Sequence, residues 1–73
     1  MMERLKAKLK LHFSDVHIIS GALYIMDEGE DTVKIVLDED TFKIYRDGVY
    51  VKRCYTFEEV LHVLLLRRKN EKN

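Results

Sequence analysis

The chain has 73 residues, 47% of them hydrophobic, and its 13 basic and 13 acidic residues balance to a formal net charge of zero. This length fits one domain, and the hydrophobic content is too high for a disordered chain. A balanced charge argues against a protein that coats nucleic acid nonspecifically. A core this small leaves a narrow margin of stability, so association with a second copy or a partner would help the fold.

Charge is nonetheless unevenly distributed along the chain. Residues 27–40 hold seven acids against Lys34, a net charge of −6. Residues 1–13 and residues 41–56 each carry a net charge of +3. We interpret the acidic segment as solvated turns, with a basic protein surface as the functional alternative.

Residues 2–13 fit two periodicities. Strict alternation of apolar residues from Leu5 to Phe13 with lysines and a histidine is typical of a strand. Met2, Leu5, Leu9 and Phe13 also line one helical stripe, with Leu11 off it. Leucine, lysine and alanine without β-branched residues favour helix, so we expect a helix that ends at Ser14-Asp15.

The middle of the chain predicts antiparallel strands. We expect one strand at 22–27, preceded by an extended segment or bulge at 16–19, and a second strand at 32–38. The acidic stretch 27–31 and Glu39-Asp40 should form turns.

The clearest local signal is Asp47-Gly48 between residues 42–46 and 49–53. An Asp-Gly pair between alternating strands predicts a type I′ hairpin, because both turn positions need positive φ. The two-residue loop predicts the pairs Arg46–Val49, Tyr45–Tyr50, Ile44–Val51 and Lys43–Lys52. Two like charges would then face each other and would need an acid to neutralise them.

A helix is predicted over residues 57–69. Thr56 and Glu59 form a capping box at its start. Its apolar stripe comprises Phe57, Val60, Leu61, Leu64 and Leu65. Residues 70–73 should be a frayed tail.

The fold class expected is α+β in a single domain, residues 1–73. It has an N-terminal helix, a three- to four-stranded antiparallel meander with the Asp-Gly hairpin, and a C-terminal helix. Both helices should lie on one face of the sheet. Many small proteins of phages and mobile elements share this plan, but a shared architecture does not imply a shared function.

The sequence gives little support for a catalytic site or a metal site. His12, His17 and His62 lack the spacing of a helical zinc site, and Cys54 has no companion cysteine. Ser14 and Ser20 stand in no nucleophile motif. We therefore expect no enzyme and no cofactor. A single cysteine, no long apolar run and no signal-peptide pattern at the N-terminus favour the cytoplasm.

The hairpin supplies the candidate binding site. One of its faces should carry Phe42, Ile44, Val49 and Val51 as core. The other should present Lys43, Tyr45, Tyr50 and Lys52, joined by Lys34 and Arg53. This second face is either a plain solvated surface or a docking surface, since tyrosines beside cations suit protein contacts and base stacking.

Two functions compete. The first is a non-enzymatic interaction module that binds a protein partner or a second copy, for instance a regulator or inhibitor from a phage or mobile element. The alternative is a nucleic-acid-binding module that uses the same outer hairpin face. A homodimer could also form through Leu11, Val63 and Leu66, which lie outside the main helical stripes.

Overall fold

The computed structural model describes the backbone of residues 1–26 and 32–71, with side chains described as far as Leu66 in the last helix. Seven elements follow one another along these described residues. They are α1 (Met2–Leu9), β1 (Val16–Ile19), β2 (Ala22–Ile25), β3 (Val33–Asp38), β4 (Thr41–Arg46), β5 (Val49–Cys54) and α2 (Phe57–Glu71). The strands form one antiparallel sheet in the order β1-β2-β3-β4-β5.

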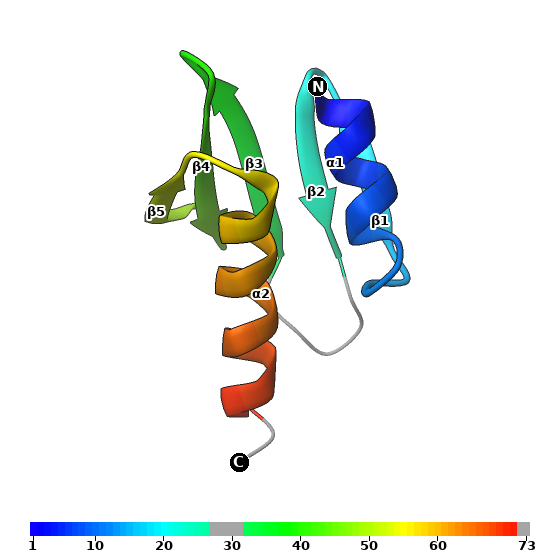
Figure 1. Ribbon diagram of the computed structural model, residues 1–73, viewed down its shortest axis with the longest axis vertical. Helices are drawn as coiled ribbons and strands as arrows, with labels where there is room; N and C mark the ends of the chain where they lie inside the picture. The colour runs from blue at the N-terminus through cyan, green and yellow to red at the C-terminus, as the bar shows by residue number, and fades with distance from the viewer. Residues whose placement is uncertain (27–31, 72–73) are drawn as a thin grey trace.

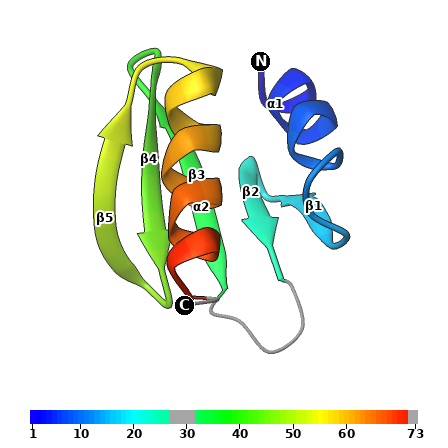
Figure 2. The same ribbon diagram turned by 60° about the horizontal axis from the view of Figure 1, so that its bottom comes forward.

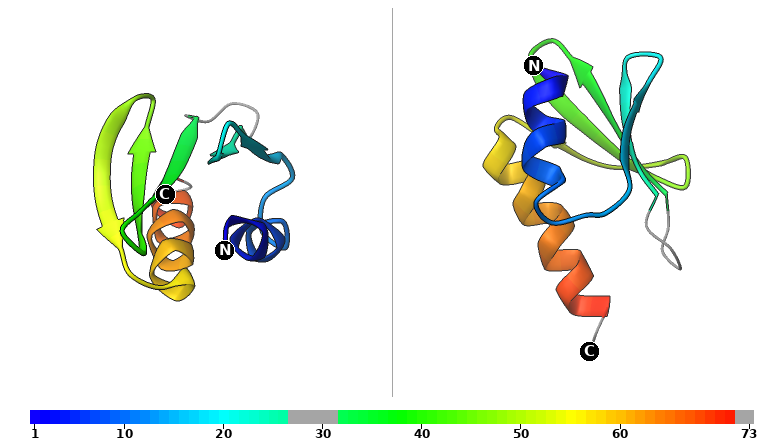
Figure 3. Two further views of the ribbon diagram at one scale, coloured as in Figure 1. Left: turned by 90° about the horizontal axis from the view of Figure 1, so that it is seen from above. Right: turned by 90° about the vertical axis from the view of Figure 1, so that its right-hand side faces the viewer.

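Both helices cover the same face of this sheet, and no helix of the described residues lies on its other face (Figures 1 and 3). The predicted α+β architecture is therefore confirmed. Figure 2 shows the molecule with its lower end turned forward. In this view α2 lies along β3 and β4, and α1 lies beside β1 and β2. Lys8 links the two helices, because its ammonium group lies 5.9 Å from the centre of the Phe57 ring.

The sheet has five strands, more than the three or four expected. The extra strand is β1, which pairs with β2 through a second tight hairpin, Val16 opposite Ile25 and Ile19 opposite Ala22. Ser20 and Gly21 turn this hairpin with φ of 51° and 81°. Ser-Gly between two apolar runs is a turn signal, whereas only an extended segment or bulge was expected at 16–19.

Three of the strand connections are two-residue turns with positive φ at both positions. Ser20-Gly21 is the first of these turns. The second is the predicted turn Glu39-Asp40, with φ of 49° and 62°, and the third is Asp47-Gly48, with φ of 47° and 82°. Positive φ at both positions is the type I′ geometry, whose twist matches that of the strands it joins. The expected turn at 27–31 lies outside the described residues.

The N-terminal segment is a helix, as its composition predicts, although it ends at Leu9 rather than Phe13. The helical stripe is also confirmed. Leu5 and Leu9 are fully buried, Phe13 is buried just beyond the helix, and Leu11 is 80% exposed.

The capping box of α2 forms with one change. The backbone N–H of Glu59 donates to Thr56 Oγ1 at 3.1 Å. The Glu59 carboxylate accepts from the backbone N–H of Tyr55, one residue before the cap, at 3.0 Å. The helix extends to Glu71, two residues beyond the expected end, and 72–73 lie outside the described residues.

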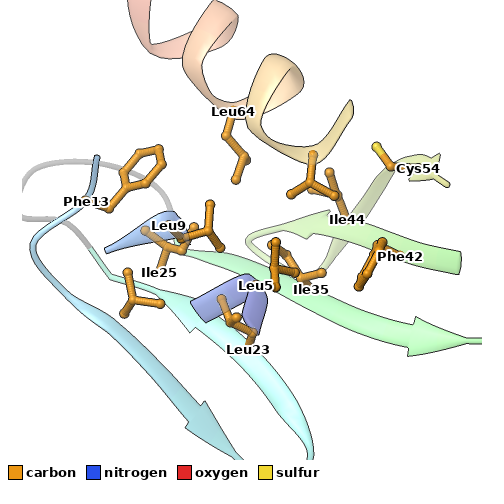
Figure 4. Packing of buried hydrophobic residues seen from close by; sticks show 12 residues of the cluster. Leu5, Leu9, Phe13, Leu23, Ile25, Ile35, Phe42, Ile44, Cys54 and Leu64 are labelled. Carbon is orange, nitrogen blue, oxygen red and sulfur yellow. The ribbon is translucent and has the colours of Figure 1, made fainter. Parts of the chain in front are cut away.

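The core lies between the helices and the sheet (Figure 4). Its helical members are Leu5, Leu9, Val60 and Leu64. The sheet contributes a larger set of buried side chains: Val16, Leu23, Ile25, Ile35, Phe42, Ile44 and Cys54. Because alternate residues of a strand point to opposite faces, the residues between these point to the outer face, the side of the sheet away from the helices.

Candidate binding surface on the outer face of the sheet

Four side chains form a row across the outer face. Tyr24 of β2 lies opposite Lys34 of β3, Lys34 lies opposite Tyr45 of β4, and Tyr45 lies opposite Tyr50 of β5. We call these four residues the tyrosine row. Directly opposite residues in an antiparallel sheet have closely spaced Cβ atoms, so the row is a continuous surface.

The rings in the tyrosine row contact their neighbours. Tyr45 and Tyr50 meet edge to face, with ring centres 5.6 Å apart and planes at 67°. The Lys34 ammonium group lies 6.0 Å from the centre of the Tyr24 ring, within cation–π range. Tyr50 is 52% exposed, and Tyr45 is half-buried. Tyr50 is therefore the most accessible aromatic anchor of the pair.

A second row, parallel to the first, carries most of the charge. Val36, Lys43 and Arg53 lie opposite one another on β3, β4 and β5. Asp38 joins this row from the end of β3, where its Oδ2 lies 3.2 Å from Lys43 Nζ and 3.4 Å from an Arg53 guanidinium nitrogen. One carboxylate thus bridges two neighbouring cations that would otherwise repel each other.

This arrangement corrects the predicted hairpin register. The pairs Arg46–Val49 and Tyr45–Tyr50 are as expected, but a β-bulge follows, so that Ile44 faces Lys52 and Lys43 faces Arg53. Val51 is the extra residue of the bulge. An inserted residue moves every following side chain by one position, and the charged neighbour of Lys43 changes from Lys52 to Arg53.

The bulge reverses the expected faces of β5 only from Lys52 onward. Val49 and Val51 were predicted to be core, but they are 67% and 43% exposed. Cys54 takes the core position opposite Phe42 instead. A two-residue hairpin predicts a regular ladder, and neither Val51 nor its neighbours carry the glycine that often marks a bulge.

Five of the six predicted site residues, Lys34, Lys43, Tyr45, Tyr50 and Arg53, therefore share the outer face. Lys52 does not belong with them. It lies opposite the buried Ile44 and points to the helix side of the sheet.

Lys52 instead lines a shallow hollow between β5 and α2. The other lining residues are Glu58, Glu59, His62 and Val63. Glu59 is already engaged with the helix cap. The hollow is therefore a mixed polar surface and not a continuation of the tyrosine row.

Tyr24 is the site residue that the sequence interpretation missed. The signal was present, because Tyr24 lies between Leu23 and Ile25, both of which are buried on the core side. Strand alternation therefore places Tyr24 on the outer face. Its position in the row depends on the pairing of β2 with β3 across residues 27–31, and this register has no local sequence signal.

Cys54 is fully buried. Burial raises the pKa of its thiol, the negative charge of Glu59 raises it further, and Lys52 opposes this in part. A raised pKa keeps the thiol protonated at neutral pH, and the thiolate is the reactive form.

Within the described residues, no three His, Cys, Asp or Glu side chains come together as metal ligands. Asp15 pairs with His17 near the start of β1, at the sheet edge far from β5. No helix in the described part of the chain has the length and apolar character needed to cross a membrane. A search of protein-family models, curated proteins and solved structures finds no match to this chain.

Proposed function

We propose that this protein is a non-enzymatic binding module whose outer sheet face docks onto another protein. The observation that carries the proposal is the tyrosine row on the sheet face opposite the two helices of the described chain. Exposed tyrosines supply large contact areas at low conformational cost and are enriched in protein interfaces. Tyr50, at the β5 end of the row, is the main anchor, and the ring of Tyr45 supports it.

The charges of the face favour a protein partner over a nucleic acid. Asp38 neutralises part of the charge of Lys43 and Arg53, two cations that lie opposite each other on β4 and β5. Phosphate binding depends on cations that are free to replace counterions. The Lys34 ammonium group also lies over the Tyr24 ring, where a stacking base would have to sit.

The same charges define the chemistry of the partner. Three cations, Lys34, Lys43 and Arg53, surround the aromatic residues, against one acid, Asp38. A complementary protein surface has an apolar or aromatic centre that receives Tyr45 and Tyr50 and acidic side chains at its rim. Such a rim would steer the encounter, while the aromatic centre supplies most of the affinity.

A titration with a mixed-sequence single-stranded oligonucleotide tests the choice of partner class. We expect the parent protein to bind it no tighter than about 1 mM at physiological salt, as binding through a partly neutralised face is weak. Asp38→Asn should improve this affinity by releasing Lys43 and Arg53, and high salt should reverse the gain. The opposite result would be micromolar binding by the parent that salt weakens and that Lys43→Glu abolishes. That result would contradict the proposal of a protein partner and favour a nucleic acid.

A further inference from the structure

The strand β5 leaves an apolar edge of the sheet uncovered. It is the last strand of the sheet, and its consecutive residues Val49, Tyr50 and Val51 are 67%, 52% and 43% exposed. The opposite edge, β1, is shorter by two residues and exposes Ile19 at 49%. An exposed apolar edge strand offers unpaired backbone groups to another strand, and native proteins usually protect such edges.

We propose that β5 pairs with β5 of a second copy of this chain, antiparallel about a two-fold axis at Tyr50. The two five-stranded sheets would then form one sheet of ten strands. This pairing goes beyond the proposed binding function and does not depend on it, because it uses the strand edge rather than the outer face.

The sequence around Tyr50 is self-complementary in this register. Tyr50 faces Tyr50 of the second copy, and Val49 faces Val51. A register centred on Lys52 would instead bring like charges face to face, which destabilises a strand pair.

The backbone at Tyr50 is oriented for this contact. In a two-residue hairpin the pair next to the turn, Arg46–Val49, exchanges hydrogen bonds within the hairpin. The backbone N–H and C=O of the following residue, Tyr50, therefore point away from β4. At the two-fold axis they would exchange two hydrogen bonds with Tyr50 of the second copy.

The β-bulge limits how far the pairing can extend. Val51 is inserted directly after Tyr50, and the charged residues Lys52 and Arg53 follow it. Bulges and lysines are common devices against continued edge pairing. The interface is therefore short, and small interfaces give weak association, so the dimer should dissociate in the micromolar range.

The pairing would double the outer face. Residues opposite each other in an antiparallel pair lie on the same face, so the tyrosine rows of the two copies would meet at Tyr50. The joined surface would present Tyr45 and Tyr50 of both copies side by side. A two-fold symmetric partner could then engage both rows at once and gain affinity through multivalency.

Sedimentation equilibrium on the full chain, from about 10 μM to 1 mM, tests the pairing. We expect a monomer–dimer equilibrium. Val51→Lys should weaken it about 100-fold, roughly tenfold for each of the two symmetric positions. Ile19→Lys, a matched change on the other edge strand, should leave it unchanged. Both side chains are exposed, so each variant should keep the parent circular dichroism spectrum.

Cross-linking locates the axis. Opposed Cα atoms in a hydrogen-bonded antiparallel pair are about 5.5 Å apart, which suits a disulfide. Tyr50→Cys should form a covalent dimer on mild oxidation, whereas Ile19→Cys should not. A monomer at every concentration would overturn the proposal. Dissociation by Leu66→Lys but not by Val51→Lys would also overturn it, in favour of pairing through the helices.

Discussion

At the scale of single residues, Asp38 controls the charge of the outer face. The sequence predicted that a lysine pair in the hairpin would need an acid, and the structure supplies this acid to Lys43 and Arg53. Their side chains are 29% to 41% exposed, so solvent screens the ion pairs and their contribution to stability is small. The main consequence of Asp38 is for recognition, because it lowers the positive potential that a polyanion would meet.

Cys54 should make the stability of the protein depend on pH in the alkaline range. Burial and Glu59 raise the pKa of its thiol, so the unfolded chain loses this proton at a lower pH than the folded protein does. The free energy of unfolding should therefore hold below the ordinary thiol pKa of about 8.5 and fall as the pH rises through the raised value.

Urea unfolding of the parent and of Cys54→Ala at a series of pH values from about 7 to 10 measures this effect. The variant should be less stable at neutral pH, because it leaves a small cavity. It should also lose less stability on going to alkaline pH. Parallel curves for the two proteins would show that the thiol does not carry the dependence.

At the scale of elements, α2 depends on its cap. Thr56→Ala leaves the backbone N–H of Glu59 without its acceptor and should lower the free energy of unfolding by about 1 kcal/mol. Thr32→Ala is a matched control, because Thr32 is exposed and lies outside any helix. Equal midpoints for the two variants in urea would contradict the role of the cap.

The Asp47-Gly48 turn depends on backbone geometry alone. Gly48 has φ of 82°, and a Cβ atom placed there would meet nothing within 4 Å. Any loss of stability on substitution thus comes from the strain of positive φ and not from a clash with a neighbouring element. Gly48→Val should cost well over 1 kcal/mol, since β-branched residues are outliers in this region. A thermal melt equal to that of the parent would contradict the type I′ turn.

Most elements could be predicted because their signals are local. The apolar stripe and capping box of α2 and the Asp-Gly turn each lie within a few residues of sequence. The bulge at Val51 could not be predicted in this way. It depends on Cys54 taking a buried place opposite Phe42, a tertiary preference that outweighs the regular ladder. Beyond the bulge, the predicted hairpin register was therefore wrong by one position. It placed Lys52 on the outer face, whereas Lys52 lies on the helix side.

At the scale of the whole molecule, the two faces of the sheet differ in kind. One is covered by α1 and α2 and supplies the core, and the other presents the tyrosine row and its cations (Figure 3). Alternation along β2, β3 and β4 could predict which of their residues share the outer face, but the bulge prevented this for the end of β5. The order of strands across the sheet, which brings Tyr24 next to Lys34, needed the tertiary structure.

The central claim is that this outer face docks onto a protein, and a capture experiment with the tagged full chain tests it most directly. The double variant Tyr45→Thr/Tyr50→Thr keeps strand propensity and removes both anchors, and Leu11→Thr/Leu66→Thr is the control on the helix side. The partner isolated with the parent, in nuclease-treated extract of its native cells, should bind the tyrosine variant at least about 100-fold more weakly. It should bind the helix-side variant as well as the parent. Equal affinity of that partner for the tyrosine variant and the parent would contradict the account.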